Sequence, residues 1–251
     1  MKRLKISQDW WNEVLPEGLP YPTSTLISGP GGSGKPLIGF ALVQDWLKSG
    51  GNVLFIPLQY PETSFVKKTL KELYDMDVEK YPNSTTYVQF DPDVEDIEKL
   101  DKNKIKANLL KPEVWDKIIE DSERSMGDGG DLGTLVFASA LNLLLFSPTY
   151  KEKILEHLKV LLRSDKDRTY LFNVSTSAMS EDIKVWEEVA DNLMFARMGD
   201  DMKLYLKIKR MSSKEVSLEE IHVPIEKEML TDIKDVAEDV RKRRIPKLKK
   251  I

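Results

Sequence analysis

The 251-residue chain contains no cysteine. This absence excludes disulfides, thiolate zinc sites and cysteine nucleophiles, and it fits a reducing compartment, so we expect a cytoplasmic protein. No apolar run reaches the ~20 residues of a membrane span, and the first residues lack the apolar segment of a signal peptide. The chain has two histidines, His157 and His222, far apart in the sequence. We therefore predict neither a membrane contact nor a bound metal ion.

Charged residues make up 32% of the chain, and Lys and Glu dominate them, a composition that thermophilic proteins favour. The net charge of −4 divides into +7 in the final segment, RKRRIPKLKKI (241–251), and −11 in residues 1–240. Such a basic segment binds nucleic acid or an acidic partner. Alternatively, it is a solvated, frayed terminus. Both alternatives are open at this point.

Apolar patterns predict alternating strands and helices along most of the chain. This alternation indicates an α/β fold, with a mainly parallel twisted sheet and helices on both faces. The last strands follow one another without helices between them, which predicts an antiparallel extension at one edge. The charged segment 92–104 is expected to form surface structure. The predicted strands are 24–28, 52–58, 85–90, 134–139, 168–177, 192–197, 202–211 and an edge strand in 215–225; the predicted helices are 36–50, 61–76, 111–125, 149–164, 180–190 and 228–244.

The segment ISGPGGSGKPLIGF (27–40) has the spacing of a phosphate-binding loop between a strand and a helix. Glycines let successive backbone N–H groups turn toward a phosphate, and the helix N-terminus adds partial positive charge. A lysine at the end of the loop neutralises the outer phosphates. The predicted nucleotide-binding residues are Gly29, Gly31, Gly32, Ser33, Gly34 and Lys35.

The residue after the lysine is Pro36, where a phosphate-binding loop has serine or threonine. That hydroxyl normally coordinates Mg²⁺. Proline has neither a hydroxyl nor a backbone N–H, although it suits the first turn of a helix. We therefore expect the loop to keep its shape and to lose the metal ion.

The segments STLISGPGGSGKP, FALVQDWLKSGGNVLFIPLQ and ADNLMFARMGDDMKLYLKIKRM together resemble the archaeal KaiC-like branch of the RecA-superfamily P-loop ATPases. The resemblance extends from the opening DWWNEVLPEGLPYPTS to about residue 213. It implies a RecA-like core that binds nucleotide at subunit interfaces of rings or filaments. The protein would accordingly form a homo-oligomer or assemble with a related RecA-like protein.

The resemblance also assigns the chemical positions. The carboxylate that holds Mg²⁺ corresponds to Ala138, and the glutamate that activates water corresponds to Gln59. A glutamine can orient water but cannot take its proton; the nearest carboxylate, Glu62, lies three residues further on. The residues that reach a neighbouring subunit's phosphate correspond to Lys209 and Arg210, with the arginine shifted by one position.

Pro36, Gln59 and Ala138 all affect one reaction, so we predict a degenerate member without Mg²⁺-dependent hydrolysis and without catalytic residues. Two functions remain open: residual binding of ATP or ADP in a regulatory or assembly role, or a scaffold with a vestigial pocket that binds a protein or nucleic acid. The predicted domain covers residues 1–228, and a C-terminal amphipathic helix and basic tail cover 229–251. Residues Ser175–Ser177 end a strand where such folds place site residues and could meet a phosphate or a substrate, but capping the next helix is the role that we expect.

Overall fold

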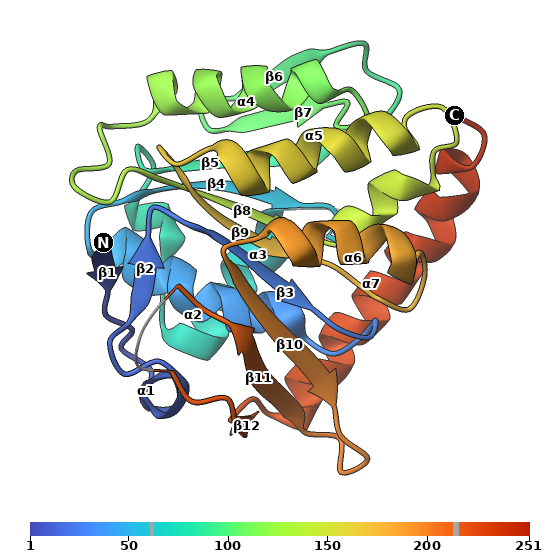
Figure 1. Cartoon of the computed structure of the whole chain (residues 1–251). Coiled ribbons are helices and arrows are strands. Elements are labelled where there is room, and N and C mark those ends of the chain that lie inside the picture. Colours follow the sequence, from blue (N-terminus) through green and yellow to red (C-terminus); the bar gives the residue numbers. More distant parts are fainter. Residues whose placement is uncertain (61–62, 213–215) are drawn as a thin grey trace.

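A ten-stranded sheet runs through the centre of the computed structural model, which describes residues 1–60, 63–212 and 216–251 (Figure 1). The strand order is β12-β11-β10-β3-β9-β8-β4-β5-β7-β6, and the seven strands from β10 to β7 run parallel. The strands are β3 Ser24–Ser28, β4 Asn52–Pro57, β5 Thr85–Phe90, β6 Ile97–Asp101, β7 Lys104–Ala107, β8 Thr134–Ser139, β9 Thr169–Asn173, β10 Asn192–Met198, β11 Leu204–Arg210 and β12 Glu220–Val223.

Both edges of this sheet are antiparallel. The predicted extension is present as β10–β11–β12. The charged segment 92–104 contributes a second antiparallel pair, β6–β7, at the opposite edge. No sequence signal predicted this hairpin, because its side chains are mostly charged and its outer strand is exposed. Charged residues protect such an edge strand from pairing with other chains.

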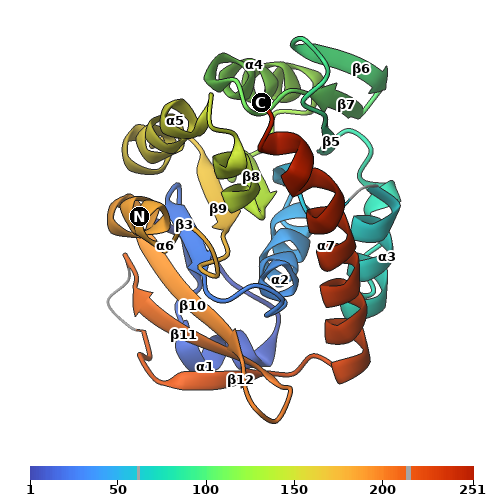
Figure 2. The same cartoon turned by 90° about the vertical axis from the view of Figure 1, so that its right-hand side faces the viewer.

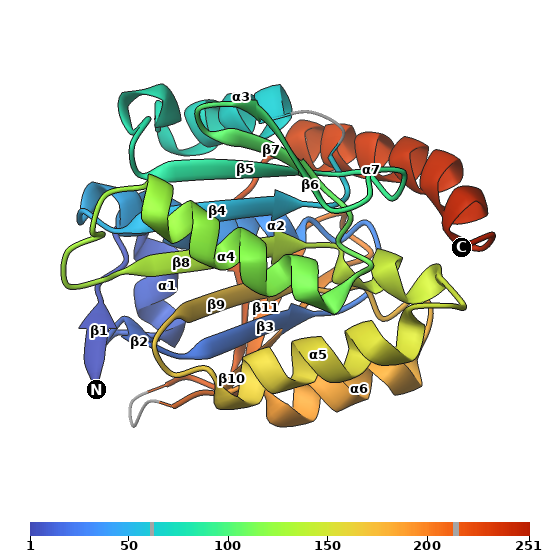
Figure 3. The same cartoon turned by 90° about the horizontal axis from the view of Figure 1, so that it is seen from above.

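Helices cover both faces of the sheet (Figure 3). One apolar core holds residues of α2, α3 and the first half of α7, and the other holds residues of α4, α5 and α6. Successive side chains of a strand point to opposite faces, so each strand contributes to both cores. The helices are α1 Asp9–Val14, α2 Lys35–Lys48, α3 Thr63–Tyr74, α4 Pro112–Ser125, α5 Lys151–Ser164, α6 Ser180–Val189 and α7 Lys227–Leu248; short 3-10 helices span Val78–Lys80 (η1) and Leu141–Phe146 (η2).

A smaller two-stranded sheet pairs β1 (Lys2–Leu4) with β2 (Leu19–Tyr21) ahead of β3. Among the described residues, no helix combines the length and apolar character that a membrane crossing requires.

The C-terminal helix differs from its prediction. One of the two alternatives for residues 241–251, a frayed tail, is wrong because α7 continues to Leu248. Figure 2 shows α7 crossing in front of α2 and next to α3. Its N-terminal half packs into one core through Leu230 and Ile233, and Leu248 reaches the other core. The basic residues from Arg241 to Lys247 therefore lie on a packed helix, and Lys249 and Lys250 follow its end.

Candidate functional site

The loop between β3 and α2 has the backbone that its glycines predict. Gly29, Gly32 and Gly34 have φ of +140°, +75° and +72°, which L side chains rarely adopt. A methyl group on Gly29 would lie 1.9 Å from the carbonyl oxygen of Ala196, so only glycine fits where the loop leaves the sheet. Gly34 precedes the first turn of α2, and its conformation turns the chain into the helix.

The side chain of Lys35 folds back over this loop and is buried. Its Nζ donates hydrogen bonds to the carbonyl oxygen of Gly29 at 2.9 Å and to Ser33 Oγ at 3.0 Å, and also to the carbonyl oxygen of Pro30. Burial, and next the charge of Arg241, lower the pKa of Lys35 to about 7. The lysine therefore lies at the place where a loop of this kind meets a phosphate, and it has no carboxylate partner among these contacts.

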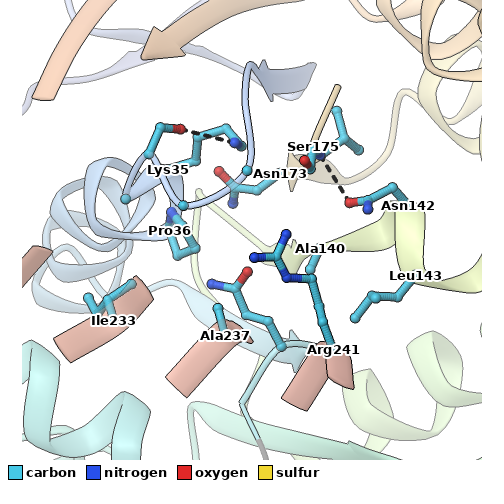
Figure 4. A pocket seen from close by; sticks show the side chains of 16 residues that line it. Lys35, Pro36, Ala140, Asn142, Leu143, Asn173, Ser175, Ile233, Ala237 and Arg241 are labelled. Atoms are coloured by element: carbon cyan, nitrogen blue, oxygen red, sulfur yellow. Dashed lines mark hydrogen bonds between the residues drawn. The ribbon is translucent and has the colours of Figure 1, made fainter. Parts of the chain in front are cut away.

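Helix α7 lies directly over the loop (Figure 4). A methyl group built on Gly34 would lie 2.7 Å from Leu230 Cδ2, and one on Gly32 would lie 3.3 Å from Lys234 Cγ. A methyl group on Gly31 would lie 2.9 Å from Arg241 Nη1. The space left between loop and helix measures about 40 Å³. That volume holds about three water molecules, whereas ordinary small-molecule sites hold several hundred Å³.

The wall opposite α7 comes from the end of β9 and from the residues that follow β8 and β9, and it includes several polar side chains. Gly31 N donates to Ser177 Oγ at 2.8 Å, and Ser175 N donates to Asn142 Oδ1 at 3.0 Å. Asn173 is 1% exposed, lines the cavity, and has no hydrogen-bond partner for its Oδ1. Its Nδ2 reaches only the Ala138 carbonyl oxygen, at 3.5 Å.

The predicted capping role of Ser175–Ser177 is wrong. The residue at the N-terminal cap of α6 is Met179, and no side chain caps this helix. The serines instead lie beside the glycine loop. Tertiary structure places them there because β9 runs parallel to β3, so that both strands end at the same edge of the sheet.

The end of β8 presents no carboxylate to the loop. Ala138 packs in the core formed with α4, α5 and α6, on the sheet face away from α2. Phe137 packs on the α2 face, and alternation places Ser139 on that face as well. The side chain that points toward the loop helix at this strand end is thus Ser139, one residue beyond the predicted position.

Gln59 lines the cavity, as expected for the position after β4. Its Nε2 donates to the hydroxyl oxygen of Tyr60 at 2.6 Å, and burial raises the pKa of that tyrosine. The predicted alternative carboxylate, Glu62, lies outside the described residues. Among residues 1–60, 63–212 and 216–251, no group of three or more His, Asp or Glu side chains is placed to hold a metal ion.

Lys209 and Arg210 lie at the end of the sheet opposite the loop. Arg210 pairs in register with Leu193, which pairs with Leu26, whereas the loop follows Ser28 at the other end of β3. The Arg210 guanidinium donates to the carbonyl oxygens of Glu187 and, at 2.7 Å, Ala190 at the end of α6. Arg210 is thus engaged with α6, and Lys209 Nζ lies 5.7 Å from the centre of the Phe195 ring. The predicted contact of both residues with a neighbouring subunit's phosphate stays a prediction.

Sequence reasoning missed Arg241, Asn142 and Asn173 as residues of the site. A signal for Arg241 was available, because it continues the apolar stripe of Leu230, Ile233 and Ala237 at helical spacing. The asparagines carried no comparable signal. They meet the loop only because neighbouring parallel strands end together.

Comparison with solved structures identifies the fold. The chain is similar to a KaiC-like protein from the hyperthermophilic archaeon Pyrococcus horikoshii OT3, with a TM-score of 0.67 and 14% sequence identity. The match covers 90% of this chain and 96% of the other. No protein-family model and no curated protein matches the sequence. The predicted RecA-like architecture is therefore confirmed at the level of the fold.

Proposed function

We propose that this protein is a degenerate, KaiC-like member of the RecA fold that does not hydrolyse ATP and that holds the phosphates of ATP or ADP in a regulatory or assembly role. One observation carries the proposal. The loop between β3 and α2 keeps glycine conformations suited to a phosphate and a buried lysine, whereas Pro36 replaces the hydroxyl that would hold a metal ion.

The loss of hydrolysis follows from the groups around the loop. The site does not fit Mg²⁺, because Pro36 offers no ligand oxygen and β8 ends in Ala138 and Ser139. Gln59 can position a water molecule but cannot accept its proton. Phosphoryl transfer depends on a metal ion and positioned charges, and each loss costs orders of magnitude in rate.

A second candidate function, a scaffold with a vestigial pocket, is supported by the position of α7. Leu230, Ile233 and Ala237 cover the loop, and the 40 Å³ beneath them leaves no room for a nucleoside. In this case the fold would serve a protein or nucleic-acid partner, and the loop would be a remnant. The two candidates differ in one measurable property, which is nucleotide affinity.

Calorimetric titration with ATP and ADP, in Mg²⁺ and in excess EDTA, separates them. We expect binding that does not depend on Mg²⁺, no phosphate release over hours, and loss of binding in Lys35→Met. Steady turnover in Mg-ATP would refute the loss of hydrolysis. No heat at millimolar nucleotide would leave the scaffold as the function.

We further propose a cytoplasmic protein of archaeal, thermophilic origin that forms a homo-oligomer or joins a related RecA-like protein. The RecA-like fold supports the assembly, because the resemblance implies nucleotide sites between subunits. Sedimentation velocity with and without ADP measures the assembly. A monomer at every concentration tested would contradict the homo-oligomer.

A further inference from the structure

Among the residues that the structure describes, the cavity between the loop and α7 is lined by two cationic side chains and by no carboxylate. Lys35 and Arg241 are the ionisable residues among its lining. The guanidinium of Arg241 lies against Gly31, and its recorded ion pair, with Glu238, is long at 4.0 Å. Two like charges near one another disfavour each other unless one group loses its proton or an anion lies between them.

Hydrogen-bond donors converge on the same cavity. The glycine loop and the N-terminus of α2 line it, and the helix terminus adds partial positive charge. The N–H groups of Gly31 and Leu37 already donate, to Ser177 Oγ and to the Gly34 carbonyl oxygen. Hydroxyls of Ser175 and Ser177 border Gly31.

Independently of the helix terminus, the side chain of Asn173 is buried at 1% exposure and lines the cavity (Figure 4). Its Oδ1 has no partner among the described residues, and its Nδ2 makes a hydrogen bond of 3.5 Å to the Ala138 carbonyl oxygen, so rotation of the amide loses little. An amide can turn its NH₂ group toward an anion.

The size of the cavity selects among anions. Room for about three water molecules suits one tetrahedral oxyanion and excludes a base and sugar. Three of the lining side chains, Ile233, Ala237 and Arg241, come from α7. Helix α7 therefore contributes both the positive charge of Arg241 and one side of the cavity.

We propose that this cavity binds one phosphate-type oxyanion without Mg²⁺, held between the loop amides, Lys35 and Arg241, with the guanidinium in the electrostatic role of the missing metal ion. The proposal rests on the proposed function in that the loop binds phosphate. The oxyanion is inorganic phosphate when α7 is docked. It is the terminal phosphate of a nucleotide when α7 moves away from the base and sugar.

The test is calorimetric titration of the full chain with inorganic phosphate, ADP and ATP in excess EDTA, for wild type, Arg241→Gln and Arg241→Lys. Arg243→Gln is the matched control, because Arg243 lies two residues away on α7, is exposed, and pairs with Asp239. We expect Arg241→Gln to weaken binding about 10- to 100-fold, as loss of a charged hydrogen bond does. Arg241→Lys should recover part of the affinity, and the control should bind as wild type does. Circular dichroism verifies that each variant folds.

The outcomes separate the two proposals. Phosphate binding that depends on Arg241 supports the oxyanion site; binding of nucleotide alone, with the same dependence, supports it with the nucleotide as the source of the phosphate. Equal affinity of wild type and Arg241→Gln for every anion would overturn the role of Arg241 and leave the proposed function intact. No binding of any of the three anions by the wild type would overturn both.

Discussion

At the scale of single residues, the site combines a retained cation with lost oxygen ligands. Lys35 is buried and has a lowered pKa, while Pro36 beside it removes a hydroxyl and an N–H. The proline does not disturb helix α2, because proline is tolerated in the first turn of a helix. The chemistry of the loop can thus change without a change in its shape.

The titration of Lys35 gives a prediction for stability. Its pKa is about 7 in the folded chain and about 10.4 in an unfolded one. Between these values the unfolded chain binds more protons, so the free energy of unfolding rises with pH from about 7 to 10.4. Below pH 7 the cost of the buried charge is fully present. In Lys35→Met this contribution disappears, and the pH dependence should flatten by about 5 kcal/mol over the whole window, with about half of that difference between pH 7 and pH 9.

Urea denaturation of wild type and Lys35→Met at pH 7, 8 and 9 measures the difference. In the part of the chain that the structure describes, the other ionisable residue lining the cavity is Arg241 from α7. The same slope in both proteins would show that Lys35 is not the titrating group. Saturating phosphate should reduce the slope in the wild type, because an anion favours the charged lysine.

The direction of side chains on β8 gives a second prediction. In Pro36→Thr/Ser139→Asp, a hydroxyl and a carboxylate both face the loop, and Mg²⁺ should then increase the affinity for ADP. In Pro36→Thr/Ala138→Asp, the carboxylate is buried in the apolar core beneath α4–α6. The free energy of unfolding of this variant should fall by about 3 kcal/mol or more. Its affinity for ADP should not depend on Mg²⁺. Titration of ADP with and without Mg²⁺, with melting curves, compares the two. If Mg²⁺ increased the affinity for ADP in the Ala138→Asp variant and not in the Ser139→Asp variant, Ala138 would be the position that faces the loop.

At the scale of elements, α7 is the part of the fold that limits access to the loop. Beyond Arg241 it is held by Arg244, which donates to the carbonyl oxygen of Leu58 at 2.6 Å and lies 5.5 Å from the centre of the Phe90 ring. Lys247 pairs with Asp93, and Leu248 is buried. The helix is thus docked along its length, and its first half covers the glycine loop.

Weakening that contact should open the loop. Ile233 is 2% exposed, so Ile233→Ala should lower the free energy of unfolding by about 2–4 kcal/mol. Hydrogen exchange of residues 29–35 should become faster. Asp235→Ala on the exposed face of α7 is the control, and it should change neither quantity. Unchanged exchange of the loop in Ile233→Ala would indicate that α7 does not protect it.

At the scale of the whole molecule, the packing of α7 divides the basic residues of segment 241–251 into buried-side and exposed ones. Arg241 and Arg244 point inward, whereas Lys242, Lys249 and Lys250 are exposed. Deletion of 241–251 would therefore remove core contacts together with surface charge. A test of nucleic-acid binding has to change the exposed lysines alone.

If the segment binds nucleic acid, the triple variant Lys242→Gln/Lys249→Gln/Lys250→Gln should weaken binding to all sequences alike and reduce its salt dependence. Fluorescence anisotropy with two unrelated oligonucleotides, at several salt concentrations, measures both effects. The stability of the triple variant should match the wild type. Unchanged affinity and salt dependence would exclude this segment as the binding surface.

Much of this architecture was predictable because its elements carry local signals. The strand at 134–139 and the glycine loop follow from apolar runs, glycine and lysine spacing. The hairpin of β6 and β7 was not predictable, because charged side chains conceal its pairing with β5. The predicted position at Ala138 failed for a related reason: in a strand, a change of one residue reverses the face to which the side chain points.

The sequence by itself determined the glycine loop and its lack of a hydroxyl ligand for a metal ion. Gly29, Lys35 and Pro36 are close together in the chain, so their chemistry is local. Only the tertiary structure decided what surrounds the loop. Asn142, Asn173 and Arg241 come from segments more than 100 residues away in the sequence. The parallel order of β3, β9 and β8 brings the first two to the loop, and the apolar stripe of α7 brings the third. Burial of apolar surface is non-directional and does not depend on distance along the chain, so it brings residues that are far apart in the sequence next to the loop.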